Sequence, residues 1–126
     1  MGSRVDSFFD ELIANDLVYI VVIHKGKEVL RAKSKLHSED EFFAEKLIEF
    51  ANKIFSNATD SLSKLPDIEG EISYTIIRLN NGFSLLFAKY DDLGLITVTK
   101  TDSLAEYEEI KQLLRRVKEI ISGPLE

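Results

Sequence analysis

The sequence contains no cysteine and only two histidines, His24 and His37. The absence of cysteine excludes a disulfide framework, a cysteine-based zinc site and a thiol nucleophile. Two histidines leave little for a histidine-rich metal site or a catalytic triad. Basic residues are also in the minority, because 16 Lys and Arg stand against 22 Asp and Glu, which gives a net charge of −6. A nucleic-acid binder shows a basic excess, so we expect no nucleic-acid partner.

Long apolar runs and nucleotide-binding motifs are missing as well. No stretch approaches the ~18 consecutive apolar residues of a membrane-spanning helix, and the first residues lack the apolar run of a signal peptide. We therefore expect a cytoplasmic protein without a transmembrane segment. No P-loop or dinucleotide fingerprint appears. Asp91 and Asp92 are interpreted as turn formers, because no third ligand follows at calcium-loop spacing. The sequence thus predicts no enzyme activity, no cofactor and no metal site.

The residues that are present fit one soluble globular domain. The chain has 126 residues, of which 44% are hydrophobic and 30% are charged. Both the length and the composition are typical of a single folded domain. We assign residues 1–126 to one domain, in which residues 1–3 resemble a cloning remnant.

Hydrophobic periodicity and turn signals predict the element order α-β-β-α-β-β-β-α. The predicted segments are 5–15, 17–24, 28–34, 38–64, 71–79, 83–90, 95–101 and 103–122. Short turns at Asn80-Asn81-Gly82 and at 91–94 join the last three strands, which indicates an antiparallel meander. The predicted fold class is therefore α+β, a five-stranded antiparallel sheet with helices on both faces.

The composition of three strands predicts their places in the sheet. Segment 17–24 is β-branched and aromatic without polar alternation, which is typical of a central strand. Segment 28–34 carries Arg31 and Lys33, so it reads as an edge or half-exposed strand. Segment 71–79 lacks the lysine or proline that protects an exposed edge, so we expect a second chain to cover it.

The long second helix has a wider apolar face than a sheet alone requires. Ser38 and Glu41 form a capping box at its start, and Pro66 ends it. Its predicted core face contains Phe43, Leu47, Phe50, Ala51, Ile54, Ala58 and Leu62. Ile48 and Phe55 lie beside that face and widen the apolar arc to about 160°, whereas a helix on a sheet needs about 100°. The excess predicts a second partner, either another chain or a further segment of the same chain.

The element order and the stretches 18–30 and 74–98 resemble the Roadblock (dynein light chain) family of GTPase-regulator type. The resemblance covers nearly the whole chain and rests on apolar and turn patterns. Ser103-Leu104-Ala105 departs from the Asn-Leu-Gly-like segment that opens the last helix in many relatives, which weakens a closer subfamily assignment. Longin-like and profilin-like domains share a related core.

The resemblance implies a dimer, with itself or with another Roadblock-like chain, formed by the long helix and the third strand. We predict that the interface contains Ile48, Ala51, Phe55, Leu62, Ile72, Tyr74 and Ile76. The resemblance also implies that the dimer is a platform for small Ras-like GTPases without catalytic residues of its own.

The first hairpin carries the one local excess of positive charge, Lys25, Lys27, Arg31, Lys33 and Lys35. One interpretation is a solvated outer face. The other is an electrostatic contact of Lys27, Arg31 and Lys33 with an acidic GTPase surface, or with anionic lipid in peripheral membrane association.

The sequence therefore predicts a non-catalytic dimeric interaction platform that binds and regulates or scaffolds a small Ras-like GTPase. The alternative is a longin- or profilin-like adaptor for membrane-trafficking or cytoskeletal partners. A third class, a small-molecule sensor, requires a pocket, and we expect Phe83, Leu85 and Phe87 to fill that space.

Overall fold

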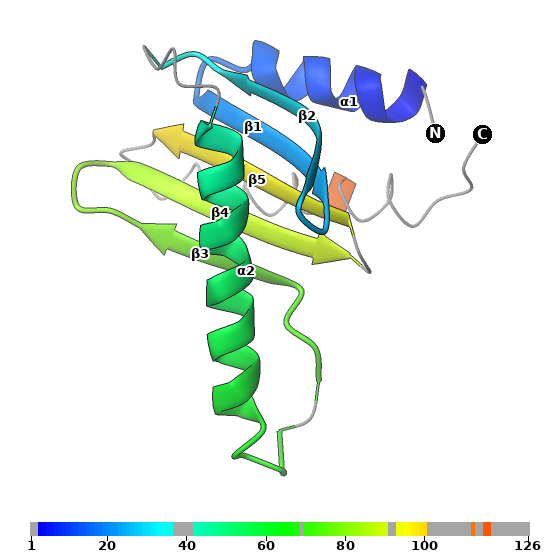
Figure 1. Ribbon diagram of the computed structural model, residues 1–126. Coiled ribbons are helices and arrows are strands. Elements are labelled where there is room, and N and C mark those ends of the chain that lie inside the picture. The colour runs from blue at the N-terminus through cyan, green and yellow to red at the C-terminus, as the bar shows by residue number, and fades with distance from the viewer. Residues whose placement is uncertain are drawn as a thin grey trace.

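The computed structural model describes residues 3–36, 42–68, 70–90, 93–100 and the single residues 112, 115 and 116. The elements run in the order α1 (Ser3–Ala14), β1 (Val18–Lys25), β2 (Glu28–Ser34), α2 (Phe43–Leu62), β3 (Tyr74–Arg78), β4 (Phe83–Tyr90) and β5 (Leu93–Lys100) (Figure 1). Gln112, Arg115 and Arg116 are helical. The rest of the predicted 103–122 helix and the capping box of Ser38 and Glu41 lie outside the described residues.

The strands form one antiparallel sheet in the order β2-β1-β5-β4-β3 (Figure 1). β1 pairs with both β2 and β5, and most of its residues are buried. The prediction of a central first strand is therefore confirmed. β2 and β3 form the two edges. The predicted α+β class with a five-stranded antiparallel sheet is also confirmed.

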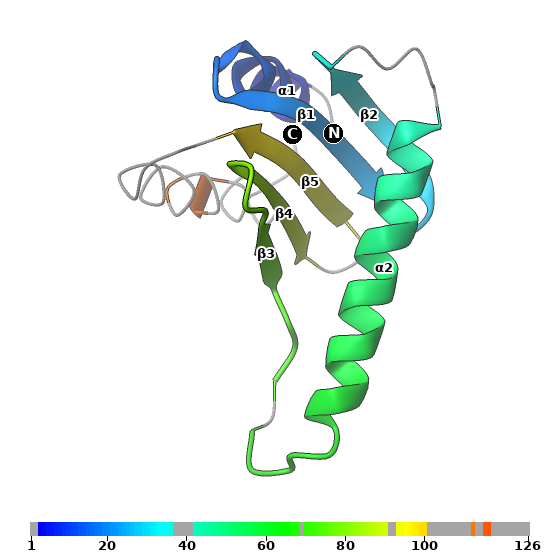
Figure 2. The same cartoon turned by 90° about the vertical axis from the view of Figure 1, so that its left-hand side faces the viewer.

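Helices cover both faces of this sheet, as Figure 2 shows from the side. The α2-side core contains Ile20, Val22, Ala44, Ile48, Ala51, Phe87, Ile96 and Val98. The α1-side core contains Phe9, Leu12, Val18, Val21, Ile23, Ala88 and Leu95. Alternate residues of β1 enter opposite cores, because successive side chains of a strand point to opposite faces.

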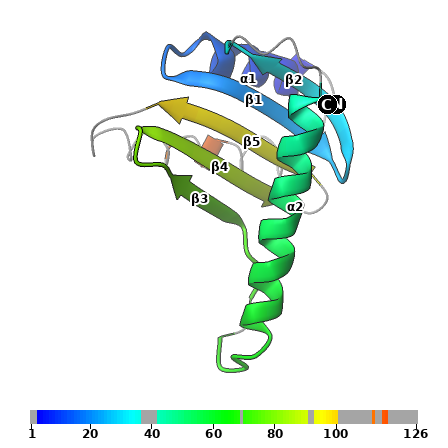
Figure 3. The ribbon, with the colours of Figure 1, turned by 60° about the vertical axis from the view of Figure 1, so that its left-hand side comes forward.

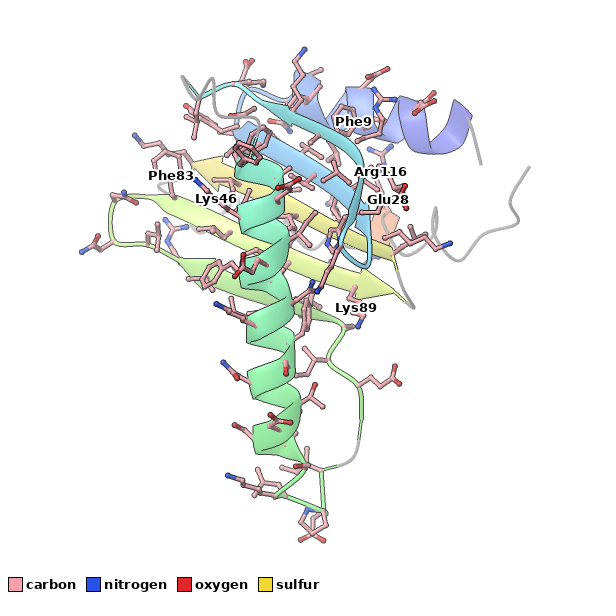
Figure 4. All side chains as sticks on the ribbon, in the orientation of Figure 1. Phe9, Glu28, Lys46, Phe83, Lys89 and Arg116 are labelled. Carbon is pink, nitrogen blue, oxygen red and sulfur yellow. The ribbon has the colours of Figure 1, made fainter. Side chains whose placement is uncertain are left out.

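Arg116 lies beside α1 and is labelled below that helix in Figure 4. Its Nη1 and Nη2 donate hydrogen bonds to the two carboxylate oxygens of Glu11, at 2.5 and 2.6 Å. The bidentate contact lowers the pKa of the Glu11 carboxyl, because the guanidinium favours its ionised form. Since α1 covers the face opposite α2, Arg116 lies on that face as well.

The predicted hairpin turn at Asn80-Asn81-Gly82 is confirmed. Gly82 has a φ of 95°, a value that glycine adopts without the steric penalty of a side chain. The Asn81 Oδ1 accepts a hydrogen bond from the Phe83 N–H at 3.2 Å. The turn therefore has both the glycine and the side-chain hydrogen bond that stabilise tight connections.

The predicted boundaries of β5 and β3 are wrong. Leu93 and Gly94 belong to β5 and not to the preceding turn. Gly94 pairs with His24 of β1, and an added Cβ would lie 2.1 Å from the His24 Nε2. Glycine is needed there because a side chain approaches closely, not because the chain turns. The third strand covers Tyr74–Arg78 and is shorter than predicted.

Candidate interaction surface

α2 packs on the sheet through its first half. Its buried residues are Ala44, Ile48 and Ala51, whereas none of residues 52–62 is buried. Figures 1 and 3 show the reason, since α2 crosses the sheet and its C-terminal part extends past β3. The predicted core face is wrong in orientation, because Ile48 is 2% exposed and Phe50 is 44% exposed. The helix is rotated so that Ile48 is buried against the sheet, whereas Phe50 contacts it only at the margin and remains partly exposed.

The rotation leaves one apolar stripe of α2 incompletely covered, which we call the α2 shoulder. It consists of Phe43, Leu47, Phe50 and Ile54. The Phe50 ring contacts Phe87 edge-on, with 5.5 Å between the ring centroids, and the other three pack at the margin of the α2-side core. Their spacing of four, three and four residues is that of a helix–helix seam. The width of the apolar arc, on which the sequence prediction relied, does not reveal this spacing.

β3 is a sheet edge, and its outer side has no strand partner in the described ranges. The Ser73 carbonyl oxygen accepts a hydrogen bond from the Lys89 N–H. The Leu79 N–H donates a hydrogen bond to the carbonyl oxygen of Phe83. The odd-numbered residues of this segment therefore direct their backbone groups at β4. In an antiparallel ladder the alternate residues point the other way, so the backbone groups of Tyr74 and Ile76 face the open edge.

The seven residues predicted for the interface fall into two groups. Ile48 and Ala51 are 2% and 1% exposed and belong to the α2-side core, so packing within the chain occupies them. The other five are half-buried or exposed, namely Phe55, Leu62, Ile72, Tyr74 and Ile76. Ile77 packs toward α2, so by strand alternation Tyr74 and Ile76 lie on the opposite face of the sheet. The α2 shoulder is the part of the surface that sequence reasoning missed.

Arg31, predicted as a partner contact, binds α1 within the chain. Its guanidinium forms ion pairs with Asp6 and Asp10, and lies 4.5 Å from the centroid of the Phe9 ring. Pairs as exposed as these contribute about 1 kcal/mol or less each. Their effect is to join β2 to α1.

The lysines of the first hairpin differ in their surroundings. The Lys35 Nζ donates a hydrogen bond to the carbonyl oxygen of Asn15, at 2.9 Å. Lys27 and Lys33 are exposed. Because Arg31 and Lys35 contact other parts of the chain, the first hairpin does not form one continuous basic face, although Lys27 and Lys33 are exposed on it.

His24 is a buried side chain held within the sheet. It is 7% exposed, and its Nδ1 donates a hydrogen bond to the Gly26 carbonyl oxygen at 2.9 Å. Burial lowers the pKa of His24, because desolvation disfavours the imidazolium form. The positive charge of Lys89 acts in the same direction. Both effects favour the neutral form of the ring.

Residues 3–36, 42–68, 70–90 and 93–100 contain no group of three His, Asp or Glu side chains arranged to hold a metal ion. Asp91, Asp92 and His37 lie outside these ranges. None of the helices described is long and apolar enough to cross a membrane.

Comparison with known proteins bears on the fold. No protein-family model and no curated protein matches the sequence. The crystal structure of a Roadblock/LC7 domain from Streptomyces avermitilis is 14% identical with a TM-score of 0.68, and the match covers 96% of this chain and 100% of that one. The gliding protein MglB from Thermus thermophilus is 16% identical with a TM-score of 0.70, covering 97% and 93%. MglB from Myxococcus xanthus is 15% identical with a TM-score of 0.68, covering 95% and 96%.

These matches agree with the geometry described above. They extend over nearly the whole chain, which includes the five-stranded sheet with α1 and α2. The resemblance to the Roadblock family that the sequence indicates is confirmed at the level of the fold. The chain has the Roadblock/LC7 fold.

Proposed function

We propose that the chain forms a dimer through the α2 shoulder and the β3 edge, and that the dimer is a non-catalytic platform for a small Ras-like GTPase. The observation that carries the proposal is an incompletely covered apolar stripe on a helix that extends past an open strand edge. Exposed edges of this kind pair with other chains unless charge or proline protects them. A partner chain that covers both the α2 shoulder and the β3 edge would bury apolar surface and would also form hydrogen bonds with the backbone groups on the outer side of β3.

A two-fold arrangement suits this surface. In a symmetric dimer each chain uses the same patch, so β3 pairs with its copy in antiparallel fashion and the two shoulders meet. Ile76 is the middle residue of β3 and lies next to the axis in this arrangement. Phe50 is the most exposed member of the shoulder. Burying a side chain of this size contributes about 1.5–3 kcal/mol when the burial is complete.

A similar solved structure supports assembly of several copies. It is described as MglB with a tetrameric arrangement, with a TM-score of 0.68 and 16% identity to this chain. The Roadblock/LC7 fold is therefore compatible with self-association. Pairing with a different Roadblock-like chain is the alternative, and it would use the same surface.

The GTPase part of the proposal rests on the resemblance to the Roadblock family. The chain has no P-loop of its own, so the nucleotide belongs to the partner. A platform without catalytic groups accelerates or slows hydrolysis by changing the order of the switch residues of the GTPase. Lys27 and Lys33 are exposed and would attract an acidic partner surface.

Substitution of proline for Ile76 tests the β3 edge. The Ile76 N–H points away from β4, so proline removes a hydrogen-bond donor from the open edge and leaves the β3–β4 ladder intact. We expect light scattering to give twice the chain mass for the wild type and the chain mass of 14.3 kDa for Ile76→Pro. Ile76→Val retains the N–H and should remain a dimer. A wild-type mass of 14.3 kDa at every concentration tested would contradict the dimer.

A binding assay tests the GTPase partner. The immobilised chain is exposed to purified Ras-like GTPases loaded with GDP or with a non-hydrolysable GTP analogue. We expect at least one GTPase to be retained, with a preference for one nucleotide state. The double variant Lys27→Glu with Lys33→Glu should weaken retention and its dependence on salt, whereas Lys64→Glu, a charge reversal elsewhere, should not. Retention of none would favour the longin- or profilin-like adaptor for membrane-trafficking or cytoskeletal partners.

A further inference from the structure

A cavity of about 180 Å³ lies between α2 and the sheet, at the end where β1 turns into β2. Its buried lining includes Ala51, Phe87 and Ile96, which belong to three different elements of the α2-side core. Its mouth consists of the exposed residues Gly26, Asn52 and Lys89. The expectation that the bulky strand residues fill the interior is therefore wrong at this end of the sheet.

His24 supplies a fixed hydrogen-bonding group to this cavity, of which it forms part of the wall. Its Nδ1 hydrogen is donated to the Gly26 carbonyl oxygen, at 2.9 Å. In the neutral ring the other nitrogen, Nε2, is then an acceptor. The missing side chain of Gly94 leaves room for this edge of the ring, since a Cβ there would lie 2.1 Å from Nε2.

The charge at the mouth of the cavity further limits which ligands can bind. Lys89 projects from the end of β4, as Figure 4 shows, and lines the cavity. Its positive charge disfavours a second cation beside it. A guest with a hydroxyl donor and no positive charge therefore matches both the acceptor on His24 and the charge of Lys89.

The volume and the lining indicate the size of the guest. Apolar cavities of about 150 Å³ bind benzene. The cavity beside His24 measures about 180 Å³, which is enough for one aromatic ring with a small substituent. Phe55 and Phe87 contribute aromatic surface on the α2 side and on the sheet side, and such rings pack well edge-to-face against another ring.

We propose that this pocket binds an uncharged molecule with a single aromatic ring and one hydroxyl donor, a phenol, whose hydroxyl donates to the His24 Nε2. The ring lies between α2 and β4, and the hydroxyl is directed at β1. The pocket is on the sheet side of α2, whereas the α2 shoulder is a separate stripe of the helix. Binding therefore does not depend on the proposed dimer or on a GTPase.

Titration of the ¹⁵N-labelled full chain with phenol and with toluene tests the proposal by nuclear magnetic resonance. The two probes have the same number of heavy atoms and differ in the donor. We expect phenol to shift the amide signals of Gly26, Asn52 and Gly94 to saturation. Phenol should bind about fivefold to tenfold more tightly than toluene, the effect of one hydrogen bond. Absence of saturable shifts with phenol, or equal affinities for the two probes, would overturn the proposal.

Variants locate the binding site. Ala51→Leu fills the cavity and should abolish phenol binding, whereas Ala58→Leu makes the same change on the same helix outside the lining and should leave it unaltered. Because Ala51 is a core residue and its variant is at risk of not folding, His24→Asn provides an independent test. Asparagine retains a donor for the Gly26 carbonyl oxygen and removes Nε2, so the preference for phenol over toluene should disappear. Unchanged phenol binding by a folded Ala51→Leu, or an unchanged preference in His24→Asn, contradicts the assignment.

Discussion

Replacement of Gly94 by alanine is expected to lower the free energy of unfolding by about 3 kcal/mol, the upper range for forcing an atom into a packed site. The added Cβ would lie 2.1 Å from Nε2 and 2.4 Å from Cε1 of His24. Relief requires the buried imidazole to leave its hydrogen bond with the Gly26 carbonyl oxygen. Urea denaturation followed by circular dichroism measures the change, which is a large fraction of the stability of a domain.

A double-mutant cycle separates this steric account from a general effect of alanine in a strand. His24→Ala removes the ring with which the Cβ of Gly94→Ala would clash. This substitution also leaves a cavity of its own. We therefore expect the double variant to be about 2 kcal/mol more stable than the sum of the two single effects, since residues in contact do not behave additively. Additive effects, or a Gly94→Ala variant as stable as the wild type, would show that the close approach is unimportant.

Phe50→Asp is expected to weaken self-association at least about 100-fold, because an unpaired carboxylate in an apolar seam costs about 3 kcal/mol or more. Phe50 is 44% exposed in the single chain and contacts Phe87 edge-on. Loss of that ring contact should lower the stability of the chain itself by only about 1 kcal/mol. Analytical ultracentrifugation gives the dissociation constant, and thermal unfolding gives the stability of the separated chain.

Phe42→Asp is the matched control for this substitution. Phe42 directly precedes α2, lies outside the α2 shoulder and is 61% exposed. The same exchange there should leave the dissociation constant within about twofold, as expected for a surface change away from the interface. Substitution of Phe55 would be a less specific test of the interface, because Phe55 packs at the margin of the α2-side core. Equal dissociation constants for the wild type and Phe50→Asp would exclude the shoulder from the interface.

The features that local chemistry determines were predictable from the sequence. The apolar run at 17–24 identifies a strand buried on both faces, and Asn81-Gly82 identifies a tight hairpin. Both depend on neighbouring residues only, through side-chain periodicity and through the backbone freedom of glycine. The meander predicts that β3, β4 and β5 are neighbours, but the sequence did not predict that β1 pairs with β5 to complete the order β2-β1-β5-β4-β3.

The features that depend on packing between elements were not predictable in the same way. The apolar arc of α2 is so wide that the helix could pack on a sheet in several rotations. The sequence does not show which rotation occurs, the one in which Ile48 is buried and Phe50 stays partly exposed. The sequence suggests that Arg31 is available to a partner, because the acidic residues of α1, such as Asp6, come close to it only in the folded chain. The residues around Gly94 are typical of a turn. The side chain that requires glycine at this position is that of His24, which lies 70 positions earlier in the sequence.

The projection of α2 past the sheet has a consequence for the affinity of the proposed dimer. Residues 52–62 have no buried member, and helices shorter than about 12–15 residues are marginal in water without tertiary support. Any fraying of this end in the free chain would be reversed in the proposed dimer, at a cost of about 1–2 kcal/mol of conformational entropy for each backbone residue that is fixed. Exposed positions such as Asn57 and Ser61 would then change the affinity through their helix propensity, by up to about 0.7 kcal/mol each. In the proposed dimer, the affinity would in this way depend also on residues that do not contact the partner.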